Sequence, residues 1–153
     1  MEGKMTMAVA DNPVAALRAL LTGNASENSR LLAEFDRDTD DAGYSALVNA
    51  AFFEAVDRRF GKGSSPADLM AYVADVRSRS SDIAAKMDPN IGERLIRMVL
   101  TGEPADDIDT RTSARAKLFI LAALIVDQDF GSAELDQFLA KTRKMADYLL
   151  RDV

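Results

Sequence analysis

The sequence of 153 residues contains no cysteine, no histidine and no tryptophan. Without cysteine, the chain can form no disulfide bond, thiolate zinc site or cysteine nucleophile. Without histidine, it lacks the most common metal ligand and the only side chain that ordinarily titrates near neutral pH. Any acid–base chemistry would therefore fall to carboxylates or lysines with shifted pKa values.

Positive charge is also scarce, because 25 acidic residues face 19 basic ones and give a net charge of −6. Such a surface repels phosphate backbones, so we expect no nucleic-acid partner. The longest apolar run, Leu118 to Val126, has nine residues and is too short to span a membrane. The first residues do not resemble a secretory signal. We therefore expect a cytoplasmic protein with no membrane partner and no cofactor.

Apolar residues follow helical spacing through most of the chain, as in residues 69–76, 91–99 and 135–149. In residues 46–61 and 116–131, apolar side chains cover most of the helix surface, which is typical of central helices enclosed by others. Residues 118–126 could also form a strand, but the helix formers in residues 114–117 favour a helix. The predicted fold class is all-α, with six or seven helices in a bundle.

Proline and glycine residues mark the expected helix ends. We expect helices to start at Asn12-Pro13, Ser65-Pro66 and Asp88-Pro89, and to be followed by a left-handed glycine at Gly23, Gly61, Gly102 and Gly131. The expected linkers are residues 24–29, 36–43, 62–64, 79–82 and 103–112. Residues 1–11 are predicted to be a disordered segment whose removal costs little stability, and residues 12–153 a single helical domain.

Three pairs of segments resemble each other in the same order along the chain. LRALLTG (17–23) matches IRMVLTG (96–102), AVDRRFG (55–61) matches IVDQDFG (125–131), and residues 67–77 match residues 133–143. The similarity predicts an internal repeat of residues 16–79 and 95–144, built as two related three-helix units that each surround their own central helix. Two independent helical hairpins remain the alternative.

An acidic segment before the first central helix suggests a calcium loop, with carboxylates at Asp36, Asp38, Asp40 and Asp41. Asp41 stands where such a loop needs glycine, and Leu47 stands where it needs glutamate. We therefore interpret these carboxylates as helix caps, as we do for Asp106, Asp107 and Asp109 in the second half.

The candidate partner interface consists of Phe52, Phe53, Arg58, Arg59 and Tyr72. Two adjacent phenylalanines point about 100° apart on a helix, so one of them is expected to reach the surface. The alternative site is the pair Asp57 and Asp127, which would form a carboxylate pair if the two central helices meet in a cleft between the units.

The segments 59–77, 88–102 and 114–143 together resemble a group of small acidic helical proteins of high-GC bacteria with no assigned activity. The resemblance spans roughly residues 44–150. It implies an all-helical fold and no functional residues.

These observations favour a non-enzymatic helical module that binds a protein partner or forms a homo-oligomer such as a homodimer. The alternative is a small-molecule or carboxylate-based catalytic site in a cleft between the two helical units. Calcium sensing is a third interpretation.

Overall fold

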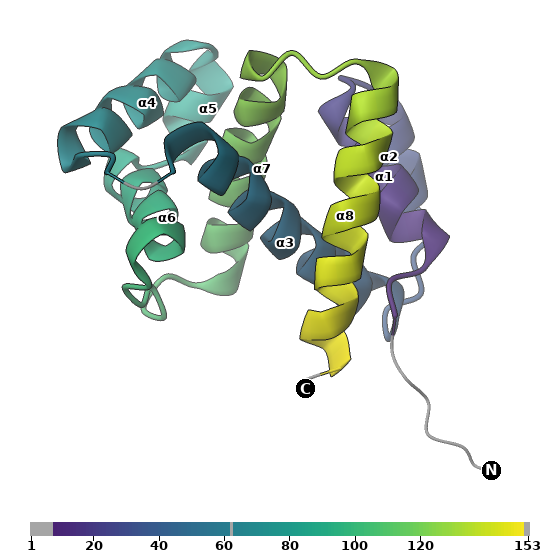
Figure 1. The fold of residues 1–153 in the computed structure, drawn as a ribbon. Coiled ribbons are helices and arrows are strands. Elements are labelled where there is room, and N and C mark those ends of the chain that lie inside the picture. The colour runs from purple at the N-terminus through teal and green to yellow at the C-terminus, as the bar shows by residue number, and fades with distance from the viewer. Residues whose placement is uncertain (1–7, 62, 152–153) are drawn as a thin grey trace. The chain divides into compact units, whose positions relative to one another are not determined.

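The computed structural model describes residues 8–61 and 63–151, and over these residues the chain forms eight α-helices and no β-strand (Figure 1). The helices are α1 (Asp11–Leu21), α2 (Ala25–Ala33), α3 (Asp40–Phe60), α4 (Pro66–Ser78), α5 (Ser81–Lys86), α6 (Pro89–Thr101), α7 (Thr110–Asp127) and α8 (Ser132–Arg151). The all-α class is confirmed. Residues 118–126 lie within α7, so the strand interpretation of that segment was wrong.

The number of helices exceeds the six or seven predicted, because α2 and α5 begin in segments that were expected to be linkers. Asn24 caps α2 by accepting a hydrogen bond from the backbone N–H of Glu27, and Ser80 caps α5 by accepting one from Asp82. Only Asn28 and Leu31 are buried in α2, and no residue of α5 is buried. Both helices therefore lack the apolar periodicity by which a helix is read from a sequence.

The predicted starts of α4 and α6 are confirmed, and at both of them a side chain caps the helix. Ser65 forms a capping box at the start of α4, and the Asp88 carboxylate accepts hydrogen bonds at the start of α6. The Asn12 boundary was wrong, because α1 begins at Asp11 without a side-chain cap. The prediction for Gly131 was also wrong: the left-handed residue after α7 is Asp129, at φ 54°.

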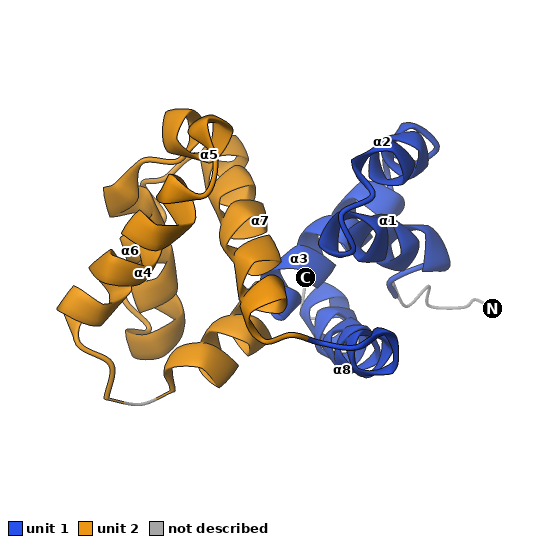
Figure 2. Ribbon diagram, turned by 90° about the horizontal axis from the view of Figure 1, so that it is seen from above, with its two compact units in different colours: residues 1–51, 130–153 blue, residues 52–129 orange. Residues whose placement is uncertain are grey.

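Two compact units divide the chain (Figure 2): residues 1–51 with 130–153, and residues 52–129. In the first unit, α1 contacts α2 and α8. In the second unit, α4 contacts α5, α6 and α7, and α6 contacts α7.

Each predicted repeat copy contributes residues to both units. Helices α1 and α4 belong to the first copy, yet α1 packs on α8, and α4 packs on α6 and α7, of the second copy. The expectation that each copy surrounds only its own central helix is therefore not met for these pairs. The internal repeat and the single domain over residues 12–153 stay predictions.

The first unit holds a residue that we expected to be disordered. Val9 is 2% exposed, and its backbone N–H donates to Asp147 Oδ1 at 2.8 Å. Its carbonyl oxygen accepts from Arg143 Nη2 at 2.7 Å, and Arg143 also pairs with Asp11. Val9 is thus packed against α8 and Asp11 begins α1, contrary to expectation, whereas residues 1–7 lie outside the described residues.

The second unit is built on the apolar faces of α4 and α7. The buried residues of α4 are Leu69, Tyr72, Val73 and Val76, as the periodicity predicts. Five residues of the apolar run in α7 are buried, while Val126 at its end is 67% exposed. Gln128 Nε2 donates to the carbonyl oxygen of Ala55 at 3.3 Å, which joins the end of α7 to α3.

Helix α3 is not enclosed on all sides. Every fourth residue along it is exposed: Asp41, Ser45, Asn49, Phe53 and Asp57. Residues four apart lie on one face of a helix, so these side chains form a single exposed stripe, which is polar except for Phe53. Across the part of the chain that is described, no helix combines the length and apolarity needed to cross a bilayer.

Candidate functional site

A buried tyrosine links α4 to the end of α7. The Tyr72 hydroxyl donates to Asp127 Oδ2 at 2.8 Å, and Arg79 Nη2 donates to the same oxygen at 2.8 Å. Arg79 Nη2 also pairs with Asp75 Oδ2 at 2.6 Å. Asp75 lies one helical turn earlier, within α4. The Asp127 carboxylate is therefore held by one neutral and one charged donor, the latter being the stronger kind of hydrogen bond.

The electrostatics of this group keep the proton on the tyrosine. The hydrogen bond from Arg79 and that from Tyr72 lower the pKa of Asp127, against the effect of its partial burial. Burial, followed by the hydrogen bond to Asp127, raises the pKa of Tyr72. A general acid at neutral pH needs a raised carboxylate pKa, and Asp127 has the opposite shift.

Replacing Asp127 with Asn tests this network through stability. We expect a loss of about 1–2 kcal/mol in the free energy of unfolding at neutral pH, because charge-assisted hydrogen bonds disappear. The pKa of Asp127 is lowered by folding, so its stabilisation is present above the unfolded value of about 4 and is lost as pH falls through the folded value.

Urea unfolding at a series of pH values measures the difference between wild type and Asp127→Asn, which should shrink below about pH 4. Asp57→Asn is the matched control, since Asp57 is an exposed carboxylate in the same unit. A difference between wild type and Asp127→Asn that stays constant with pH contradicts the network.

An arginine lies over the aromatic rings of the same region. Arg59 Cζ is 4.9 Å from the ring centroid of Phe60 and 5.3 Å from that of Tyr72. The two rings meet edge to face with centroids 5.4 Å apart. A guanidinium over ring faces at this distance makes a favourable cation–π contact, which fixes the plane of the Arg59 side chain.

Beside these rings is a pocket of about 480 Å³. It lies within the second unit, between the end of α3, the connection that follows it, and α4. The lining residues are Arg59, Phe60, Ser64, Asp68, Ala71, Tyr72 and Asp75. The connection is fixed on one side by Ser64 Oγ, which donates to the carbonyl oxygen of Phe60 at 2.8 Å. The pocket therefore has a mixed lining in which Phe60, Ala71 and Tyr72 lie beside one guanidinium, two carboxylates and one hydroxyl.

The residues predicted to form a partner interface have different exposures. Phe52 is 1% exposed and Tyr72 is 6% exposed, so both belong to the core and neither offers its ring to a partner. Phe53 is 47% exposed, which confirms that one of the two phenylalanines reaches the surface. Arg58 pairs with Glu54 at 2.7 Å and remains partly exposed, and Arg59 lines the pocket.

The two carboxylates of the alternative site have separate surroundings. Asp57 lies on the exposed stripe of α3, and Asp127 is bound to Tyr72 and Arg79. Neither lines the pocket described above. The carboxylate pair of Asp57 and Asp127 stays a prediction. Among the described residues, no hydrogen bond joins these two side chains.

The acidic segment before α3 uses its oxygens on the backbone. Asp36 Oδ1 accepts from the N–H of Asp38 at 2.8 Å and from that of Thr39 at 3.3 Å, while Asp40 Oδ2 accepts from the N–H of Asp36. Asp40 and Asp41 lie in the first turn of α3, where they complement its dipole. In residues 8–61 and 63–151, no cluster of three or more carboxylates has metal-site geometry.

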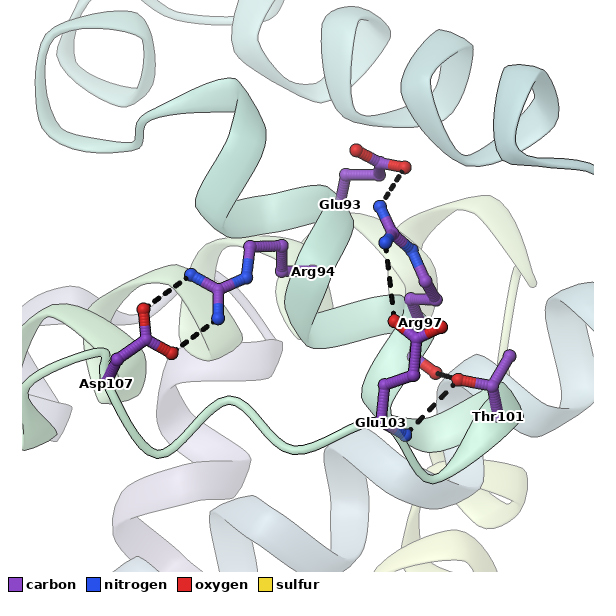
Figure 3. Close-up of polar contacts among 6 residues, drawn as sticks. All are labelled: Glu93, Arg94, Arg97, Thr101, Glu103 and Asp107. Atoms are coloured by element: carbon purple, nitrogen blue, oxygen red, sulfur yellow. Dashed lines mark hydrogen bonds and ion pairs between the residues drawn. The ribbon is translucent and has the colours of Figure 1, made fainter.

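Sequence reasoning missed a polar cluster on α6, drawn in Figure 3. Arg97 bridges Glu93, which is only 8% exposed, and Glu103 of the following loop. Arg94 donates with both terminal nitrogens to Asp107 of the same loop, which lowers the pKa of that carboxyl. The i,i+4 spacing of Glu93 and Arg97 was a readable signal. These pairs fasten the loop between α6 and α7.

Comparisons of this chain with protein-family models, with curated protein sequences and with solved structures found no match. The resemblance to small acidic proteins of high-GC bacteria therefore stays a prediction.

Proposed function

We propose that this protein is a non-enzymatic helical module that associates through α3 with a second copy of itself. Phe53 is the observation that carries the proposal. It is a large aromatic side chain, 47% exposed, in the middle of a stripe whose other members are polar. Aromatic side chains surrounded by polar residues are the usual anchors of protein interfaces.

The charges beside Phe53 are compatible with a symmetric pair. Asp57 lies one turn after Phe53 on the same face, and the partly exposed Arg58 follows it. In a two-fold interface, a patch contacts its own copy, so a patch that carries both signs complements itself. Two antiparallel α3 helices would place the acidic and basic side chains of one copy opposite those of the other.

The test compares Phe53→Ala with Leu32→Ala, a matched control at an apolar residue of α2 that is 39% exposed. Light scattering after gel filtration gives the mass at a concentration where half of the wild type is associated. We expect Phe53→Ala to weaken association at least about tenfold, equivalent to about 1.4 kcal/mol, and Leu32→Ala to leave it unchanged. Equal association of the two variants and the wild type contradicts the proposal.

Small-molecule binding is a second candidate function, and the pocket beside α4 is the observation that favours it. Its volume of about 480 Å³ falls within the range of ligand pockets, and its walls combine apolar surface with a few polar groups. This candidate is independent of self-association, because Phe53 does not line the pocket.

A further inference from the structure

The pocket beside α4 presents a guanidinium whose N–H donors are not used by the residues that the structure describes. Arg59 is held by its contacts with the faces of Phe60 and Tyr72. In the described part of the chain, it makes no hydrogen bond and no ion pair. A guanidinium has five N–H donors in a planar fork that matches a carboxylate. Arg59 is therefore placed to bind a carboxylate that enters the pocket.

A carboxylate lines the same pocket. Asp68 Oδ2 accepts from the N–H of Ser65 at 3.0 Å, and the N–H of Asp68 donates to Ser65 Oγ. This capping box fixes the position of the Asp68 side chain. Among the described residues only Ser65 hydrogen-bonds to the Asp68 carboxylate, which is exposed and has about four acceptor sites, so it can also accept from a cationic group of a ligand.

Arg59 and Asp68 interact electrostatically but do not form an ion pair. The hydrogen bonds from Ser65, helped by the charge of Arg59, lower the pKa of Asp68, so this carboxylate is ionised at neutral pH. No ion pair joins the two side chains among the described residues. The third charged lining residue, Asp75, is already paired with Arg79. The pocket therefore offers one guanidinium and one carboxylate that form no ion pair with any described residue.

We propose that this pocket binds a small zwitterion of the α-amino-acid type. The carboxylate of the ligand pairs with the fork of Arg59, and its ammonium group donates to Asp68. Phe60 and Ala71, with the small exposed part of Tyr72, supply apolar surface for the side chain of the ligand. This inference rests on the small-molecule candidate above and not on self-association.

The test uses L-phenylalanine with two analogues that each lack one charge, 3-phenylpropanoate and 2-phenylethylamine. Isothermal titration calorimetry and ligand-observed NMR measure binding to the full chain. We expect L-phenylalanine to bind at least about tenfold more tightly than either analogue, because each lost ion pair leaves a charged group of the pocket without its partner.

Arg59→Gln and Asp68→Asn are each expected to weaken the binding of L-phenylalanine about tenfold, since each removes one of the two charge-assisted contacts. Arg58→Gln is the matched control, because Arg58 carries the same charge on the same helix but does not line the pocket. Thermal melting checks that every variant is folded, and Asp68→Asn serves if Arg59→Gln does not fold.

The outcomes separate this inference from the candidate on which it rests. If 3-phenylpropanoate or 2-phenylethylamine binds as tightly as L-phenylalanine, the zwitterion proposal is wrong and the small-molecule site is supported. If no probe binds, both are overturned. If Arg58→Gln weakens binding as much as Arg59→Gln, the ligand is held elsewhere and the assignment of the pocket is overturned.

Discussion

Removal of residues 2–10 is expected to lower the free energy of unfolding by about 3–4 kcal/mol, because a buried valine and its hydrogen bonds to two charged side chains are lost. Val9 is 2% exposed, and its backbone is held by Asp147 and Arg143 of α8. The truncation would remove the backbone partner of both charged side chains and leave Arg143 only its ion pair with Asp11. Urea unfolding of the truncated and complete chains measures the loss.

Removal of residues 2–7 is the matched control, because it keeps Val9 and its contacts. The difference between the two truncations isolates the contribution of residues 8–10. Val9→Ala should reproduce about 1–2 kcal/mol of the loss, since it removes apolar contact but keeps the backbone hydrogen bonds. Equal stability of the two truncated chains would show that Val9 is not part of the folded unit.

Gly92→Val is expected to destabilise the chain by about 2–3 kcal/mol, because it overfills the contact between α4 and α6. A Cβ atom at Gly92 would lie 3.0 Å from Val73 Cγ1 and 3.5 Å from the sulfur of Met87. Val73 is fully buried, so its methyl group cannot move into solvent. A larger side chain at residue 92 must therefore push the two helices apart.

A double variant isolates the crowding between residues 92 and 73, because valine has a higher helix propensity than glycine and would by itself favour α6. Val73→Ala removes the methyl groups that residue 92 would meet, so Gly92→Val combined with Val73→Ala should cost less than the sum of the two single changes. Thermal or urea unfolding of the four proteins gives the coupling. Additive losses would indicate that Gly92 and Val73 do not pack against each other.

Local signals predicted the helices that carry an apolar face, and side-chain caps marked where α4 and α6 begin. Ser65 and Asp88 act within their own first turn, so a few adjacent residues suffice to identify them. Helix α2 was missed because its sequence is polar, and the packing of Val9 was missed because a single valine before a helix has no period.

The sequence identified single residues of the candidate site, but it did not predict which of them lie next to each other in the fold. Arg59, Tyr72 and Asp127 each stood out in the sequence, as members of two different candidate sites. Their meeting depends on how α4 packs on α7, since Tyr72 and Asp127 are 55 residues apart along the chain. No local pattern encodes such a contact, and none indicated that Asp68 would line the same pocket.

Sedimentation of the wild-type chain from micromolar to millimolar concentration measures the self-association that we propose for α3. We expect a mass that rises with concentration from that of one chain, 16.6 kDa, towards that of two. A mass of one chain at every concentration would contradict it.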